Sequence, residues 1–368
     1  FAKDFALHAA KAQGTEFDFS PYPGAKDLLE KIELTDDDKN ALDAEVDFEL
    51  TALKAMKAKA VDQLGASVFK TLKQEWPARD RIESYNAFGF KLRQDELWGG
   101  AFSNLRMLLL CCREIGNDHL AKIGQARDIA ALDFALTRLH ARGCLVASEI
   151  STLCENGFAH GALARWRTLF EIEVITLALS AGGDEIAQRY LDHAAIAIER
   201  EARAYEEKVV DLGYKNIGKR ERQLIKNQYD KAISKYGKYF AEGEYGWAIP
   251  LVDQNRPKFS DVMQFVAKQK MLPFIKFAHQ SVHSNAKALF YNIGLLEQNE
   301  IILAGASNAG HSEPIQLTAN SLVSLTAGLL RDKLANADTE AILITLSLIA
   351  RSASKAAMRA KTQQIRNH

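Results

Sequence analysis

The sequence predicts an all-α protein, a multi-helix bundle with a long N-terminal helical extension. The 368 residues include only seven prolines, and residues that favour helices are abundant. Apolar residues recur at helical spacing in several long segments, and no run with strand-like alternation of apolar and polar residues stands out. With 47% hydrophobic residues, the chain is long enough to bury a sizeable core.

The first part of the chain is predicted to be an irregular arm at 1–34, followed by a long helix. Pro21 and Pro23 interrupt any helix in the arm. Thr35 is a good N-terminal cap, acids follow it and lysines come later, as a helix dipole prefers. We expect this helix to end before Pro77. Its many charges and thin apolar stripe predict pairing of helix 35–76 with a second copy, as a homo-oligomer (dimer), or with a partner protein.

The rest of the N-terminal helical region, 35–130, is predicted to hold a second helix at 101–115. The mixed stretch before it, 79–100, is expected to pack through its aromatic side chains, Tyr85, Phe88, Phe90 and Trp98. The opening residues FAKDFALH do not form a signal peptide, and a chain that begins at Phe1 is expected to have its natural start upstream.

The core helical bundle is predicted at 131–335, and a C-terminal helix with a basic tail at 336–368. Expected core helices lie at about 129–156, 161–181, 184–213, 218–238, 260–269, 273–297 and 314–335. Asp184 is a plausible N-cap after Gly182 and Gly183, and Ser312 caps the helix that follows the loop at 304–314. The loop at 245–257 is expected to cover one end of the bundle. The apolar run 341–350 is too short to span a bilayer, so no membrane contact is expected.

The numbers of charged residues and cysteines limit the classes of function that the sequence is compatible with. Lys plus Arg and Asp plus Glu both number 47, so contact with nucleic acid would have to be local. The four cysteines lack the spacing of a zinc site and suit a reducing, cytoplasmic location. We expect no cofactor and no metal.

Charges lie in unusual positions on the helix at 161–181, which is hydrophobic nearly all round. Arg167 and Glu171 are four residues apart and can meet on one face. The simplest interpretation is an ion pair inside the bundle, and the alternative is a polar site on a rigid element. His279 and His283 have the same spacing, which suits metal ligands, but a third ligand is missing from the local sequence.

Two further patterns are each open to a functional and a structural interpretation. Arg189 and His193, in RYLDH, could hold a phosphate and move a proton, although a polar stripe that joins neighbouring helices is simpler. The segment 218–238 is basic and contains tyrosines, so it is a candidate nucleic-acid contact or the solvated face of a helix. The candidate contact residues are Lys219, Arg220, Arg222 and Lys226.

Three stretches, GALARWRTLFEIEV, AQRYLDHA and FIKFAHQSVHSN, resemble in this order the helices of a bacterial domain family of unknown function, DUF5677. The resemblance covers about 135–330. Arg167 and Glu171 match its RxxxE motif, and His283 matches its late histidine. Phe274 stands where the family usually has tyrosine, and His279 where it has serine.

A more distant similarity is to the HEPN helical bundles, whose active members are RNases of toxin and phage-defence systems. Their signature is an arginine followed after four to six residues by a histidine, and Arg113 with His119 fits that spacing. The residue after the arginine is Glu114 rather than the common Asn or Asp. The similarity implies a metal-independent RNase in which His119 activates a hydroxyl and Arg113 holds the phosphate.

Two classes of function follow. The first is an RNA-acting, RNase-type effector of defence or stress response, with catalytic residues drawn from Arg113 and His119 or from Arg167, Glu171, His279 and His283. The second is a non-catalytic helical module that binds a ligand or a partner, or a self-associating scaffold built on helix 35–76.

Overall fold

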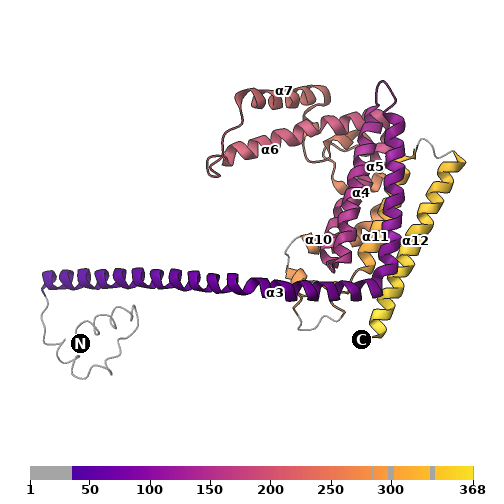
Figure 1. Ribbon diagram of the computed structural model, residues 1–368. Helices are drawn as coiled ribbons and strands as arrows, with labels where there is room; N and C mark the ends of the chain where they lie inside the picture. Colours follow the sequence, from indigo (N-terminus) through magenta and orange to yellow (C-terminus); the bar gives the residue numbers. More distant parts are fainter. Residues whose placement is uncertain (1–34, 283–285, 297–301, 332–335, 368) are drawn as a thin grey trace. The chain divides into compact units, whose positions relative to one another are not determined.

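The regular structure of the described residues is helical (Figure 1). This computed structural model describes residues 35–282, 286–296, 302–331 and 336–367. Over these ranges the regular elements are α-helices and short 3-10 helices, without a strand, which confirms the predicted all-α class. The predicted arm at 1–34 lies outside the described residues. The chain divides into two units, Phe1–Ala87 and Phe88–His368, so the division falls inside the predicted N-terminal region 35–130.

The first described helix, α3, runs from Asp36 to Ile123 and passes through Pro77. The predicted end of a helix before Pro77 and the separate helix at 101–115 are therefore wrong. A proline inside a helix removes one backbone hydrogen bond and costs about 3 kcal/mol. This part of α3 is exposed, so water can satisfy the carbonyl group that loses its partner. The side chain of Arg81 also bonds the carbonyl oxygen of Pro77, at 3.1 Å.

Aromatic side chains along α3 differ in burial. Tyr85 and Phe88, which were predicted to pack, are 77% and 61% exposed, whereas Trp98 is buried as expected. From Trp98 onward α3 contributes one face to the core of the second unit, through Ala101, Phe102, Leu105, Leu108, Leu109 and Cys112.

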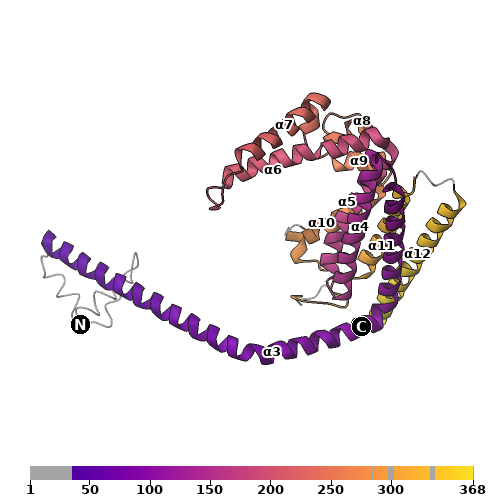
Figure 2. The same ribbon diagram turned by 45° about the horizontal axis from the view of Figure 1, so that its top comes forward.

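The centre of the second unit consists of α4 (Ala131–Glu155), α5 (Ala159–Asp192) and α11 (Ser312–Leu329), which lie side by side (Figures 1 and 2). Helix α12 (Ala337–Arg366) packs against α11, and α10 (Leu272–Val282) against α5. Helix α10 corresponds to the predicted helix 273–297 but ends earlier, at Val282, and a 3-10 turn at Ala286–Leu289 follows. The core side of α12 is a stripe of small residues, Ala350, Ala353, Ala357 and Ala360, which lets the helices approach closely.

Gly183 makes a kink within α5 instead of ending it. Its φ of 76° lies in the left-handed region that glycine adopts without strain, and helix resumes afterwards. Asp184, predicted to cap the following segment, accepts a hydrogen bond from the backbone N–H of Leu132 at 2.9 Å. Asp184 therefore satisfies a free donor at the start of α4.

At one end of the bundle, α6 (Ala194–Lys208) and α7 (Lys219–Tyr236) form a helical hairpin (Figures 1 and 2). The carboxylate of Glu199, on α6, is almost fully buried and accepts two bonds from Arg222, at 2.7 and 2.9 Å. The following segment packs Phe240 and Trp247 into the core. It contains short helices at Lys238–Ala241, Gly246–Ala248, Ile249–Val252, Phe259–Phe265 and Gln269–Met271.

The segment that leads into α11 joins three helices. The indole of Trp98, on α3, donates to the carbonyl oxygen of Asn308 at 2.7 Å, and Gln364, on α12, donates to the same oxygen at 3.1 Å. The ring of His311 is fully buried, 2.8 Å from the amide nitrogen of Gln94 on α3. These bonds connect α3 and α12 to the start of α11.

Helix α12 is long and apolar enough to cross a membrane, judged by length and composition among the described residues. Core helices of proteins without membrane spans meet the same criterion. Part of its apolar surface faces the bundle, while Ile344 and Leu348 are 60% and 54% exposed. The expectation of no membrane contact therefore stays a prediction.

Close packing of α4 on α11 leads to a test of stability. A methyl group added at Gly143 would collide with the side chain of Leu325, whereas nothing lies within 4 Å of one added at Gly99. We expect Gly143→Ala to lower the free energy of unfolding by about 1–3 kcal/mol through overpacking. Gly99→Ala, the control, is expected to be neutral or stabilising by up to about 1 kcal/mol. Urea unfolding measures both, and equal stability of the two variants would contradict the packing described here.

Candidate functional site

The residues singled out from the sequence lie in different parts of the second unit. Arg113 and His119 are on α3, Arg167 and Glu171 are on α5, and His279 is on α10. His283 lies outside the described residues. The basic candidates, Lys219, Arg220, Arg222 and Lys226, are on α7.

A cavity of about 340 Å³ lies between α3 and α4 and includes Arg113. Leu120, Ala141 and Leu145 give it an apolar wall. Its polar lining consists of Arg113, Asn117, Thr137, His140, Cys144 and Ser148. This mixture of an apolar wall with a few polar groups is typical of small-molecule sites, and the volume lies at the lower end of their range.

Arg113 is held at this cavity by a chain of hydrogen bonds. Its guanidinium donates to the hydroxyl of Ser148 at 2.5 Å, and that hydroxyl donates to the backbone oxygen of Cys144 at 2.9 Å. Within the described ranges, no carboxylate lies in ion-pair distance of Arg113. The exposed side chain therefore keeps donors for an external anion.

His140 forms a buried part of the cavity lining, with 2% of its surface exposed. Its Nε2 is 3.1 Å from the hydroxyl of Thr326, and its Nδ1 is 3.9 Å from the sulfur of Cys144. Burial lowers the pKa of His140 to about 4, so the ring is neutral at pH 7. A side chain at Gly116 would begin 2.8 Å from Nδ1, so glycine leaves room for this ring.

His119 is only 6% exposed and does not line the cavity. Its Nε2 is 3.9 Å from the carboxylate of Asp133, at the start of α4. The two residues of the Arg113/His119 motif therefore differ, since Arg113 reaches solvent and His119 faces the interior.

Arg167 and Glu171 do not form the predicted ion pair. Glu171 accepts a hydrogen bond from the hydroxyl of Tyr245 at 2.5 Å, and Nε of Arg167 is buried without a hydrogen-bond partner among the described residues. Burial and the bond to Glu171 raise the pKa of Tyr245 well above its usual value. The prediction failed because the partner of Glu171 comes from a loop far along the chain.

The ion pair within this part of the bundle involves Glu173 instead. Its carboxylate is 3% exposed and lies 2.6 Å from the ammonium group of Lys268. Lys268 also donates to the hydroxyl of Ser324 on α11 at 3.2 Å. His279, half-buried, is on α10, which packs against the same helix α5.

The polar stripe at 189–193 joins neighbouring elements, as its simpler interpretation predicted. Arg189 donates to the carbonyl oxygen of Trp247 at 3.2 Å and lies over the ring of Tyr236. Asp192 accepts a bond from the Tyr236 hydroxyl at 2.6 Å, and His193 meets the ring of Phe240 edge to face. These residues attach α7 and the following segment to α5.

The basic residues of α7 are not equivalent. Lys219, Arg220 and Lys226 are exposed. Arg222 donates hydrogen bonds to Glu199 and, at 2.9 Å, to Glu206, so its charge is paired within the α6–α7 hairpin. Nucleic-acid contact through the three exposed residues stays a prediction.

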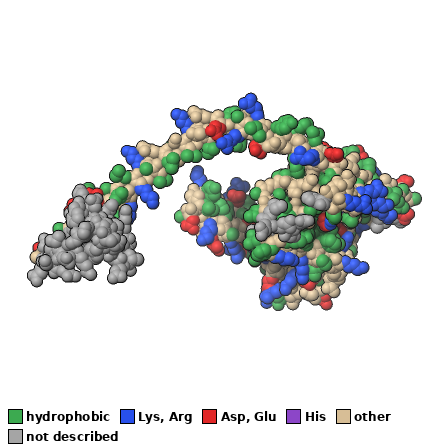
Figure 3. Space-filling view, turned by 90° about the horizontal axis from the view of Figure 1, so that it is seen from below, with side chains coloured by type: hydrophobic (Ala, Val, Ile, Leu, Met, Phe, Trp, Pro, Cys, Tyr) green, Lys and Arg blue, Asp and Glu red, His purple; other side chains and the backbone are tan. Residues whose placement is uncertain are grey.

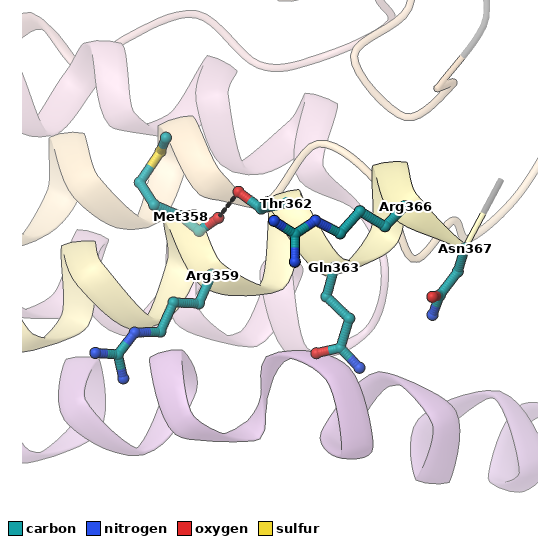
Figure 4. A pocket seen from close by; sticks show the side chains of 6 residues that line it. All are labelled: Met358, Arg359, Thr362, Gln363, Arg366 and Asn367. Carbon is teal, nitrogen blue, oxygen red and sulfur yellow. Dashed lines mark hydrogen bonds between the residues drawn. The ribbon is translucent and has the colours of Figure 1, made fainter.

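A larger hollow, of about 690 Å³, lies along the end of α12 (Figure 4). It is lined by Met358, Arg359, Thr362, Gln363, Arg366 and Asn367, all from one helix or the residue that ends it. Arg359 and Arg366 bring positive charge to this surface. The lining residues of this hollow come from one helix, whereas the cavity between α3 and α4 is lined by two helices.

The cysteines and histidines show no metal centre over the described ranges, where no group of three or more potential ligands gathers. All four cysteines are free thiols. Burial raises the pKa of Cys112 to about 11 and that of Cys144 to about 12, so both stay protonated at pH 7.

Sequence reasoning missed His140, Tyr245 and Lys268. His140 had a usable signal, because it stands four residues before Cys144 on the apolar face of α4. Glu173, a second carboxylate on an otherwise apolar helix, signalled the need for a cation. Nothing local in the sequence marks Lys268 or Tyr245 as the partners.

The buried ion pair leads to a test with a matched control. Lys268→Met leaves the carboxylate of Glu173 buried without its cation, so we expect the free energy of unfolding to fall by about 3–5 kcal/mol. Lys270→Met removes an exposed lysine two residues away and is expected to change it by less than about 0.5 kcal/mol. Urea unfolding at pH 7 compares the two, and similar small effects would contradict the role given to Lys268.

Buried histidines lead to a prediction for pH. Burial is the main cause that lowers the pKa of His140, His193 and His311 to about 4, below the usual 6.5. Between about pH 6.5 and 4 the three histidines therefore bind protons in the unfolded chain but not in the folded chain. Their contribution to the free energy of unfolding is fully present above about pH 6.5 and is lost as the pH falls towards 4. We expect a steady loss of unfolding free energy between pH 6.5 and 4.5. The loss of unfolding free energy should be smaller in the variant His140→Asn. Urea unfolding measures it, and a free energy of unfolding that does not change over this pH range would contradict the prediction.

Comparison with known proteins gives a match to a family model. No curated protein and no solved structure is significantly similar to the chain. Residues 133–301 match the model of the Family of unknown function (DUF5677), which includes the motif residues Arg167 and Glu171. The match contains nearly all of α4 but none of α3, so it covers one wall of the cavity. The relationship to HEPN bundles stays a prediction. Residues 133–301 therefore resemble the Family of unknown function (DUF5677), as the three stretches predicted.

Proposed function

We propose that this protein is a non-catalytic helical module that binds a small anionic ligand in the cavity between α3 and α4. The observation that carries the proposal is the position of Arg113, fixed by Ser148 beside an apolar wall, with donors left for an anion. A guanidinium in this setting holds a carboxylate or phosphate by paired hydrogen bonds.

The neutral ring of His140 supports the same proposal. An uncharged imidazole next to Leu120, Leu145 and Ala141 suits the less polar part of a ligand better than a second cation would. The ligand class is therefore a small molecule with one acidic group and a compact apolar body.

RNA cleavage through Arg113 and His119 has less support. A general base must come within hydrogen-bond reach of the hydroxyl that it activates. His119 is nearly buried beside Asp133, while Arg113 is exposed, so a single RNA phosphodiester would not meet both without movement of α3.

Binding is tested by calorimetry with benzoate, phenyl phosphate and inorganic phosphate as probes. We expect benzoate or phenyl phosphate to bind more tightly than inorganic phosphate, because they fill the apolar wall. Arg113→Gln should weaken binding at least tenfold. Arg142→Gln removes an exposed arginine of α4 outside the cavity and should leave affinity unchanged.

RNA cleavage by the same preparations is the opposing test. Cleavage by the wild-type protein that is lost in both Arg113→Gln and His119→Asn, with circular dichroism unchanged, would overturn the binding proposal in favour of an RNase. Absence of cleavage together with probe binding that depends on Arg113 would support it.

A further inference from the structure

The first unit carries an apolar stripe, most of which is exposed in the described structure. On α3, Leu53, Val61, Leu64, Val68 and Leu72 are between 44% and 66% exposed. Val46 and Leu50 continue the stripe and are half-buried. Figure 3 shows hydrophobic side chains on the surface along this helix. We call these seven residues the α3 stripe.

The α3 stripe has the geometry of a helix-pairing surface. Its members recur three or four residues apart, with Lys57 filling one position, so they follow one side of the helix for about 39 Å at 1.5 Å per residue. A helix with such a side exposed gains stability by burying it against another helix.

The order of residues in the α3 stripe is close to symmetric about residue 59. Reversing the helix about that point exchanges Val46 with Leu72 and Leu50 with Val68. It also places Lys57 at the position of Val61 and Leu53 within one residue of Leu64. Two identical helices in opposite directions would therefore bring apolar side chains into the same layers.

Charge along the helix favours the same orientation. Residues 36–49 contain seven acids and one lysine, whereas residues 69–82 contain four basic and two acidic residues. An antiparallel pair places the acidic segment of one copy beside the basic segment of the other. A parallel pair would place the seven acids of one copy beside the seven of the other, which repels.

We propose that the α3 stripe binds the α3 stripe of a second copy of this chain, antiparallel and centred near residue 59. Next to the stripe, Glu49 of one copy comes beside Lys70 of the other, and Lys57 beside Asp62. The α3 stripe belongs to the first unit and the residues that line the cavity belong to the second, so this inference does not rest on the proposed ligand.

Mass in solution tests the pairing with the full chain. Size-exclusion chromatography with light scattering should give twice the mass of one chain. Leu64→Asp, near the centre of the α3 stripe, should give the mass of one chain with unchanged helical circular dichroism of the bundle. Phe48→Asp changes a residue that is 72% exposed on the opposite side of the same helix and should remain dimeric. A monomeric wild-type protein, or equal effects of both variants, would overturn the proposal.

Orientation is tested by cross-linking the double variant Leu50→Cys/Val68→Cys with a short bismaleimide. Within one helix these positions are about 27 Å apart, beyond the reach of the reagent, so links form only between copies. Antiparallel copies give peptides that join position 50 to position 68. Links of 50 to 50 and 68 to 68 would show a parallel pair and overturn the proposal. The wild-type protein treated alongside identifies links from its native cysteines.

Discussion

Burial of α5 on nearly all sides is the constraint on which the bundle depends. A helix in this position has little access to water, so a buried charged or polar group on it is costly unless a neighbouring element supplies a partner. Lys268 supplies the cation for Glu173, and Ser321 accepts the indole N–H of Trp166 at 3.2 Å. The hydroxyl of Tyr245 supplies a donor for Glu171. These bonds fix α11 and the segment after α7 to one arrangement around α5, which apolar contact alone would not specify.

The sequence predicts well what depends on local periodicity and poorly what depends on distant partners. The helices at 131–155 and 219–236 follow from apolar spacing and flanking glycines, and the structure confirms both within a few residues. The prediction that a helix ends before Pro77 was wrong. One proline costs a helix a few kcal/mol, and the prediction left out the long helix-forming segments on both sides of it. The predicted ion pair between Arg167 and Glu171 was wrong for a different reason. Spacing along a helix shows which side chains can meet, but it does not show which partner a distant loop supplies. The position of Arg113 beside His140 needed the packing of two helices and could not be read from either.

The residues that match the family model and the residues that form the second unit are not the same. The match spans 133–301, while the core of the second unit also includes Trp98 of α3, Leu322 of α11 and Ala353 of α12. Helices outside the matched region therefore complete the hydrophobic core of the matched one. The cavity follows the same division, since α4 supplies one wall and α3 the wall with Arg113. Specificity for a ligand would then depend on a helix that the family model does not contain.

Asp184 has a consequence for how the chain folds. The turn at Asn156–Phe158 closes the α4–α5 hairpin at one end, and the bond from Leu132 to Asp184 closes it at the other. Contacts between segments so near in sequence carry a small loop-closure entropy, whereas docking of α11 and α12 on this hairpin requires closure of the much longer connection between α5 and α11. We expect the hairpin to form first and to provide the surface on which α11 and then α12 assemble. In pulsed hydrogen exchange, the amides of α4 would then become protected before those of α12.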